Sequence, residues 1–314
     1  MPTLNAQLAD WLEKLNRLTA QQRAMGSSPT PISAREGLAS MTSALVTDRP
    51  FVPRVLDALV AGQDYDVPVR LYDPEPTVEK PVCVYIHGGG HTAGSVTVYD
   101  AICRKLALSS GHLVVAVEYR LAPECPYPNG LDDCANVVRN IWQTLDDKQC
   151  SVRRGGLAVA GDSGGGAFAA TLSARFQGGP DNPIQRQILI YPNLDYTLGQ
   201  PSIDGLAEGY LLEKTRIHWY YDQYFQHHED RTKASPLFMP ITAELPETLL
   251  ITAGFCPLQD EATAYLARLA QARVPCTHHH FPDMVHAFLN MEDLVPDASA
   301  QVYRSIAEFL NGAG

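Results

Sequence analysis

From about residue 65 onward, short runs rich in β-branched residues alternate with segments of helical periodicity, and this alternation constrains the fold more than any other feature of the chain. Strands are predicted at residues 67–74, 82–90, 112–120, 156–163, 187–192, 248–254 and 276–282. Helices are predicted at residues 99–111, 130–145 and 165–177. Apolar strands that alternate with helices are typical of a mostly parallel sheet covered on both faces. We therefore expect an α/β protein.

Further helical segments lie outside this alternation. Leucines and a tryptophan recur at helical spacing from Leu4 to Leu18, which predicts an amphipathic helix. Residues 26–34 read as a Pro/Ser-rich hinge before a second short helix. We interpret residues 1–50, with an aromatic-rich insertion at about residues 200–232, as a cap on a main domain of residues 51–314. Such a cap is expected over the carboxyl edge of the sheet, where open α/β sheets bind ligands.

The composition argues against several classes of function. The 314 residues carry a net charge of −11, whereas nucleic-acid binding normally requires a basic patch. No apolar run approaches the ~20 residues of a membrane-spanning helix, and the N-terminus lacks the layout of a secretory signal. The seven cysteines are scattered without a C-x-x-C pair, as in a reduced cytoplasmic protein. We expect a cytoplasmic protein with no nucleic-acid or membrane partner. Both a monomer and a homodimer are compatible with the sequence.

The segment VAGDSGGG, residues 159–166, carries the strongest chemical signal. Gly161, Ser163 and Gly165 fit the pattern G-x-S-x-G, directly after a predicted strand and before a predicted helix. Small residues permit a sharp turn that holds the serine above the strand end, and the next backbone N–H groups then face developing negative charge. A glycine-rich turn with an incidental serine is the alternative, and the flanking strand and helix argue against it.

A second glycine-rich segment, YIHGGGHTAG, spans residues 85–94. Gly88, Gly89 and Gly90 follow a predicted strand, and without Cβ atoms their N–H groups can approach an oxyanion closely. A phosphate-binding loop is excluded because the segment lacks a G-K-[ST] ending. His87 is expected to anchor the loop and to take no part in proton transfer.

A general base for Ser163 is expected late in the chain, on a loop that follows a strand. His286, in FPDMVHAF at residues 281–288, has this position. The histidines at 278–280 lie in an alternating strand, and a zinc site that combines them with Cys276 matches no usual ligand spacing. Acyl transfer through a serine requires no metal or organic cofactor, so none is expected.

Together, the motifs HGGG, GDSGGG, EYRLAPECPYPNGLDD, SPLF and DMVHAF resemble the hormone-sensitive-lipase family of α/β-hydrolases, which includes bacterial acetyl esterases and carboxylesterases. The resemblance runs from about residue 65 to the C-terminus. It implies an α/β-hydrolase fold whose catalytic domain is residues 51–314, with Ser163 as nucleophile and His286 as base. The implied oxyanion-hole donors are the backbone N–H groups of Gly88, Gly89, Gly90 and Gly164, with Gly89 and Gly90 favoured in the loop. Gly164 stands where the family usually has alanine.

The acid that the family resemblance implies is missing. The family has an aspartate at the start of D-P-L-x-D-E, and this chain reads C-P-L-Q-D-E at residues 256–261. Cys256 therefore occupies the acid position. A thiol is a weak acceptor and is mostly neutral at about pH 7, so it stabilises an imidazolium poorly. Asp260 and Glu261 are fallback acids, although acidic residues in a first helical turn commonly just complement the helix dipole.

Two functional classes follow from these residues. The first is a serine carboxylic-ester hydrolase that acts on short-chain acyl esters as small-molecule substrates, with activity weakened by Cys256. The second is a nearly inactive protein that binds a small ligand on the same scaffold. The retention of Ser163, His286 and the glycine loop favours the enzyme, because a binding protein has no use for an oxyanion hole. The aromatic residues of the insertion either narrow a substrate pocket or form the cap's own core.

Overall fold

The computed structural model of the chain describes residues 3–179 and 182–312. Within these residues, eight strands form a sheet in the order β1-β2-β4-β3-β5-β6-β7-β8. The strands are β1 (Arg54–Val60), β2 (Val67–Asp73), β3 (Val82–Ile86), β4 (Leu113–Val117), β5 (Leu157–Asp162), β6 (Ile184–Ile190), β7 (Glu247–Phe255) and β8 (Cys276–Val285). The pairs β1–β2 and β2–β4 are antiparallel, and the other neighbouring pairs are parallel. The predicted mostly parallel sheet is confirmed.

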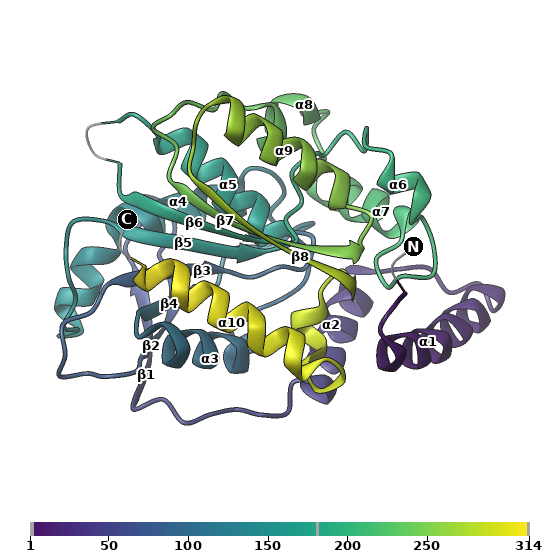
Figure 1. Cartoon of the computed structure of the whole chain (residues 1–314), viewed down its shortest axis with the longest axis horizontal. Helices are drawn as coiled ribbons and strands as arrows, with labels where there is room; N and C mark the ends of the chain where they lie inside the picture. The colour runs from purple at the N-terminus through teal and green to yellow at the C-terminus, as the bar shows by residue number, and fades with distance from the viewer. Residues whose placement is uncertain (1–2, 180–181, 313–314) are drawn as a thin grey trace.

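Helices cover both faces of this sheet, with α3 and α10 on one face and α4, α5 and α9 on the other (Figure 1). The α-helices are α1 (Ala6–Ala24), α2 (Pro31–Leu45), α3 (Asp100–Ser110), α4 (Asn129–Asp147), α5 (Gly164–Phe176), α6 (Ser202–Gly205), α7 (Lys214–Tyr224), α8 (Arg231–Ala234), α9 (Gln259–Gln271) and α10 (Pro296–Asn311). Short 3₁₀ helices span Pro236–Phe238 and Phe288–Leu294. Every residue of β3, β4 and β5 is buried, which explains why these strands read as continuous apolar runs.

Two features of the N-terminal part differ from the sequence prediction. The edge strand β1 was not predicted, because it lies before the alternating pattern and is only partly buried. The hinge is shorter than residues 26–34, since α2 already begins at Pro31. A reciprocal cap starts this helix: Ser33 N–H donates to Thr30 Oγ1 at 3.1 Å, and Thr30 N–H donates to Ser33 Oγ at 2.9 Å.

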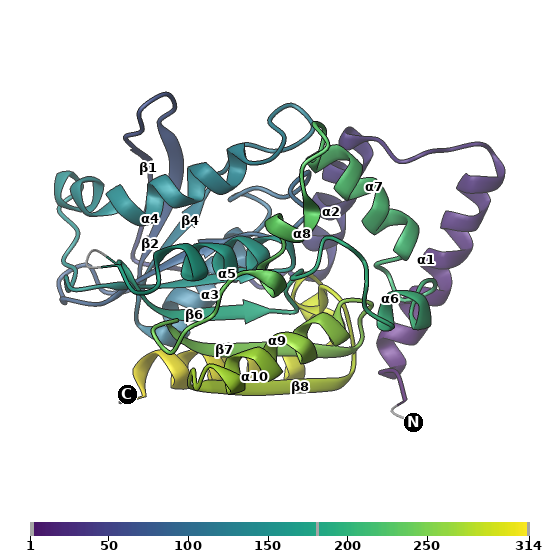
Figure 2. The same cartoon turned by 90° about the horizontal axis from the view of Figure 1, so that it is seen from above.

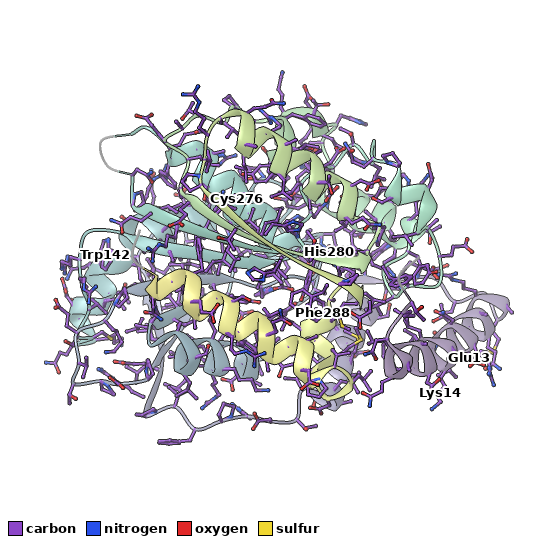
Figure 3. The ribbon with its side chains drawn as sticks, in the orientation of Figure 1. Glu13, Lys14, Trp142, Cys276, His280 and Phe288 are labelled. Atoms are coloured by element: carbon purple, nitrogen blue, oxygen red, sulfur yellow. The ribbon has the colours of Figure 1, made fainter. Side chains whose placement is uncertain are left out.

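The helices α1, α2, α6 and α7 lie at the carboxyl ends of the parallel strands (Figures 1 and 2). On α1, Leu8 and Leu12 are buried, whereas Glu13 and Lys14 lie on its outer side (Figure 3). Arg35 of α2 donates to the Thr92 carbonyl at 2.9 Å, which ties this helix to the segment after the glycine loop. Within the described part of the chain, no helix is both long and apolar enough to cross a bilayer.

Candidate active site

Ser163 lies at a sharp turn between β5 and α5. Its backbone has φ 51° and ψ −118°, a conformation that is unfavourable for a residue with a side chain. The turn depends on glycine, because a Cβ on Gly161 would lie 2.4 Å from the Gly165 backbone. A Cβ on Gly165 would lie 2.0 Å from the Ile86 carbonyl oxygen. The predicted G-x-S-x-G turn therefore has a steric basis, and it presents the serine at the end of a strand.

His286 follows directly after β8 and faces Ser163. Its Nε2 lies 2.9 Å from Ser163 Oγ, within hydrogen-bond distance for proton transfer. The imidazole is buried, which lowers the pKa of His286 to about 3 because burial disfavours the charged ring. The Tyr191 ring packs edge to face on the His286 ring, with 5.0 Å between centroids. On its other contact, Tyr191 packs on Phe288 at 5.5 Å between centroids, and Phe288 is labelled in Figure 3. The histidine is thus a neutral acceptor for the Ser163 hydroxyl proton.

Cys256 occupies the other side of the His286 ring. Its Sγ lies 3.2 Å from His286 Nδ1. With Nε2 accepting from Ser163, the network assigns the ring proton to Nδ1, which donates to the sulfur. Burial raises the pKa of the Cys256 thiol well above its ordinary value, so the sulfur is protonated and uncharged. The third group of this arrangement therefore orients the ring without supplying a negative charge.

The two fallback acids are engaged elsewhere. Asp260 Oδ2 accepts the Ser202 N–H at 2.8 Å. Glu261 Oε1 accepts the Leu194 N–H at 2.7 Å and a weaker bond from the Asn193 side chain at 3.3 Å. Glu261 is fully buried, which raises its pKa well above the ordinary range, and its Oε2 has no partner among the described residues. Neither carboxylate is bonded to His286, so the rescue considered from sequence is not supported.

The glycine loop after β3 lies beside the Ser163 turn. The Gly88 N–H donates to Asp162 Oδ1 at 2.8 Å, so Gly88 is occupied and is not an oxyanion donor, contrary to its inclusion in the predicted set. In the described residues, the N–H groups of Gly89, Gly90 and Gly164 have no protein acceptor. Gly89 and Gly90 have φ values of 115° and 60°, which favour glycine. These three donors are available to an oxyanion.

Asp162 is a site residue that the sequence analysis missed. In addition to Gly88, it accepts hydrogen bonds from the Tyr85 hydroxyl at 2.9 Å and the Tyr99 hydroxyl at 3.0 Å. Its burial raises its pKa to about 6, against the opposing effect of these donors. Asp162 directly precedes Ser163, so its bond to the Gly88 N–H holds the glycine loop beside the Ser163 turn. Its place in G-x-S-x-G gave no signal of this, because its partners lie more than sixty residues earlier in the chain.

Two buried histidines, His87 and His91, pack against the glycine loop and the residues next to it. His87 Nδ1 lies 2.8 Å from the Gly88 carbonyl oxygen, and its ring stacks on Tyr119 at 4.3 Å between centroids. His91 stacks on Phe168 at 4.4 Å and lies close to Gly164, where an added Cβ would meet the ring at 3.1 Å. Burial lowers the pKa of His87 to about 4 and that of His91 to about 3, so both rings are neutral. They act as packing groups around the oxyanion donors.

A cavity of about 310 Å³ opens above Ser163 and His286. Helices α1, α2 and α7 form much of its wall, and Gly89, Gly90 and Gly164 lie at its base. Tyr220 and Tyr221 line the cavity. Tyr224 and Phe225 are buried instead, Tyr224 against His91 at 4.1 Å and Phe225 against Tyr127 at 5.4 Å between ring centroids. Some aromatic residues of the insertion therefore line a pocket, and the others pack on residues outside the insertion.

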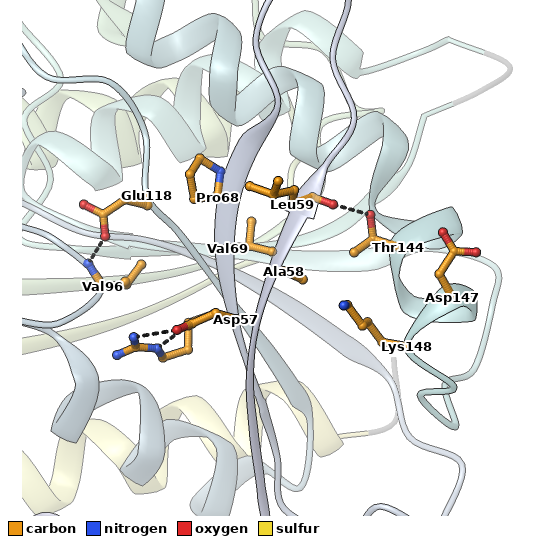
Figure 4. A pocket seen from close by; sticks show the side chains of 11 residues that line it. Asp57, Ala58, Leu59, Pro68, Val69, Val96, Glu118, Thr144, Asp147 and Lys148 are labelled. Carbon is orange, nitrogen blue, oxygen red and sulfur yellow. Dashed lines mark hydrogen bonds and ion pairs between the residues drawn. The ribbon is translucent and has the colours of Figure 1, made fainter.

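A second cavity, of about 640 Å³, lies over β1 and β2 near the end of α4 (Figure 4). It contains neither Ser163 nor His286. Its acidic groups already have partners: Asp57 pairs with Arg70 at 2.6 Å, and Glu118 accepts the Val96 N–H at 2.7 Å. Within residues 3–179 and 182–312, no three His, Cys, Asp or Glu side chains are grouped to hold a metal ion. The cavity above Ser163 is therefore the candidate active site.

Known proteins are similar to this chain in sequence and in fold. Residues 83–290 match the family model described as the alpha/beta hydrolase fold. Ethyl acetate hydrolase of Pseudomonas putida is 32% identical over 265 residues, which cover 82% of this chain and 83% of that protein. Esterase LipI of Mycobacterium tuberculosis is 33% identical over 299 residues, with 90% and 91% covered. The hyperthermophilic esterase from Pyrobaculum calidifontis has a TM-score of 0.85 at 29% identity, with 98% of each chain covered. The chain therefore belongs to the hormone-sensitive-lipase-like carboxylesterases of the α/β-hydrolase fold.

Proposed function

We propose that this carboxylesterase-type hydrolase cleaves short-chain acyl esters through an acyl-enzyme on Ser163. The single observation that carries the proposal is the 2.9 Å contact between Ser163 Oγ and His286 Nε2 at the base of a cavity. In the first step, Ser163 Oγ attacks the ester carbonyl carbon while His286 takes its proton. The carbonyl oxygen becomes an oxyanion, which accepts from the N–H groups of Gly89, Gly90 and Gly164.

The intermediate then collapses, and His286 Nε2–H gives its proton to the departing alcohol oxygen. Water attacks the acyl-enzyme by the same route in reverse, with His286 again as base, and the free carboxylic acid leaves. Both halves pass through an imidazolium, whose positive charge Cys256 does not balance. In the serine-protease template the acid both fixes the tautomer and stabilises the imidazolium, and its replacement by a neutral amide costs ~10⁴ in turnover. We therefore propose a slow esterase in which the cysteine orients His286 only.

The size of the cavity supports small substrates. Its volume of about 310 Å³ lies at the low end of the ~300–1,000 Å³ typical of ligand pockets. We assign residues 1–50 and the insertion at about 200–232 to the cap, and residues 51–314 to the catalytic domain. Residues of both cap segments line the cavity, so the cap limits acyl length. The seven cysteines, none of which forms a disulfide, support a cytoplasmic location.

The uncharged Cys256–His286 pair also favours a second candidate, a nearly inactive small-ligand-binding protein on this scaffold. Hydrolysis of 4-nitrophenyl acetate and butyrate by the wild-type chain and by Ser163→Ala distinguishes the two. The esterase proposal predicts a measurable rate that Ser163→Ala reduces to the uncatalysed background. An unchanged rate in Ser163→Ala would exclude Ser163 as the nucleophile and favour the binding protein.

A further inference from the structure

The cavity above Ser163 contains a guanidinium group that the proposed reaction does not use. Arg216, in the first turn of α7, lines the cavity together with Arg23 of α1 and Glu213. Arg23 forms an ion pair with Glu213. In contrast, among the described residues no carboxylate forms an ion pair with Arg216, and its Nη1 is buried without a hydrogen-bond partner. A buried, unpaired donor of this kind is costly unless a ligand satisfies it.

The protein contact that Arg216 does make leaves its donors unused. Its guanidinium carbon lies 5.5 Å from the centroid of the Trp219 ring, as in a cation–π contact. Such a contact uses the face of the guanidinium, whereas hydrogen bonds to a carboxylate use its edge. The group is therefore held over Trp219 and keeps its edge N–H groups for an oxygen ligand.

The position of Arg216 relates it to the reacting ester. Arg216 and Tyr220 are four residues apart on α7, so their side chains share one helix face at a separation of ~6 Å. Tyr220 packs on the glycine loop, since a Cβ on Gly90 would lie 2.6 Å from its ring. Arg216 and the oxyanion donors Gly89, Gly90 and Gly164 thus line the same cavity, with Tyr220 between α7 and the glycine loop. An acyl chain bound at those donors shares this cavity with the guanidinium.

The charge and polarity of the cavity select a particular ligand. Arg23 and Glu213 form an ion pair with each other, so among the described residues Arg216 is left as a positive charge without a counter-ion at this rim, in a chain of net charge −11. The Asp162 carboxylate also borders the cavity, but three donors already bond to it. Much of the remaining wall is apolar and includes Trp11, Leu15, Leu38, Met41, Leu212 and Ile217. A short hydrocarbon chain with one anionic end matches these surroundings.

We propose that Arg216 binds the free carboxylate of esters whose acyl group ends in a second, ionised carboxyl group, that is, monoesters of short dicarboxylic acids. This substrate class rests on the proposed hydrolysis at Ser163. A cavity of about 310 Å³ has room for only a few methylene groups between the two carboxyl groups. Glutarate and adipate monoesters are therefore the expected length, and a paired guanidinium–carboxylate contact holds the chain toward α7.

The test compares two esters that differ only in charge, 4-nitrophenyl hydrogen glutarate and methyl 4-nitrophenyl glutarate. The wild-type chain is expected to hydrolyse the charged ester with a kcat/KM about tenfold to a hundredfold higher. Arg216→Gln is expected to abolish this preference, measured as the ratio of the kcat/KM values for the two esters. Arg216→Lys is expected to keep part of the preference. The charge-matched control is Arg17→Gln, because Arg17 is exposed, pairs with Glu13 and lies outside the cavity. This variant is expected to keep the full preference for the charged ester.

A binding measurement separates this proposal from the proposed reaction. Calorimetric titration of the Ser163→Ala variant with monomethyl glutarate requires no turnover. The double variant Ser163→Ala, Arg216→Gln is expected to bind this ligand about tenfold or more weakly. Equal kcat/KM for the two esters in the wild type, or a preference that survives Arg216→Gln, would overturn the assignment of Arg216. Loss of neutral-ester hydrolysis in Ser163→Ala supports the esterase reaction whichever result Arg216 gives.

Discussion

Cys256 Sγ lies 3.2 Å from Nδ1 of His286, and the opposite ring nitrogen lies 2.9 Å from Ser163 Oγ, so the imidazole bridges the sulfur and the serine oxygen. Burial raises the pKa of the thiol and lowers the pKa of the imidazole to about 3. Both partners are therefore neutral near neutral pH. The pair fixes the direction of the ring but leaves the imidazolium that forms during catalysis without a counter-charge.

The neutral pair predicts an unusual pH dependence. Because the pKa of His286 is lowered from 6.5 to about 3, the imidazole stays unprotonated at mildly acidic pH and can still accept a proton there. We expect kcat/KM for 4-nitrophenyl butyrate to be flat from about pH 5 to about pH 8. In Cys256→Asp the carboxylate favours the charged ring, so the acid limb should move up toward the ordinary histidine value. A wild-type profile that falls with a midpoint near 6.5 would contradict the low pKa.

Gly164 is predicted to resist the alanine that the family usually has there. A Cβ at this position would lie 3.1 Å from the His91 ring, which is tighter than an ordinary van der Waals contact. Gly164→Ala should lower stability by about 1 kcal/mol and reduce kcat several-fold, because the shifted turn moves an oxyanion donor. The double variant with His91→Ala removes the contact, so its effects on kcat should be smaller than the sum of the single effects. Strict additivity in urea unfolding and in kcat would show that His91 is not the obstacle.

Asp162 is predicted to act by positioning the glycine loop. Asp162→Asn removes the charge that holds Gly88 and Tyr99, and we expect kcat to fall about tenfold or more while KM changes little. Tyr85→Phe, which removes only one of the donors to the carboxylate, should have a smaller effect. A rise in KM with kcat unchanged in Asp162→Asn would show a role in substrate binding instead.

The parts of the fold that the sequence predicted are those in which local sterics or burial restrict the residue type. The glycines around Ser163 are required by backbone contacts of about 2 Å, and the fully buried strands exclude polar residues. These constraints act at single positions, so one sequence displays them. The edge strand β1 is under weaker constraints, because only Ala58 and Val60 of it are buried, and it was not predicted.

Features that depend on several distant segments could not be predicted in this way. Asp162 is bonded by groups from β3, from the glycine loop and from Tyr99 before α3. Likewise, Glu261 and Asp260 resembled candidate acids in sequence. In the structure, Glu261 accepts the Leu194 N–H and Asp260 accepts the Ser202 N–H. The spacing of a motif shows which residues are near in the chain, whereas a hydrogen-bond partner depends on the assembled sheet. The catalytic roles of Ser163 and His286 stay predictions until they are measured.

The turnover number of Cys256→Asp on 4-nitrophenyl butyrate, relative to the wild-type chain, tests the central claim most directly. An aspartate accepts the His286 Nδ1–H and balances the imidazolium, so kcat should rise by about two to four orders of magnitude. Cys256→Ser, whose hydroxyl oxygen can also accept from Nδ1, is the matched neutral control and should stay within about tenfold of the wild type. Thermal unfolding of all three chains identifies any change in folding. A folded Cys256→Asp whose kcat equals that of the wild type would contradict the account, because position 256 would then not be the acid position of a Ser163–His286 catalytic site.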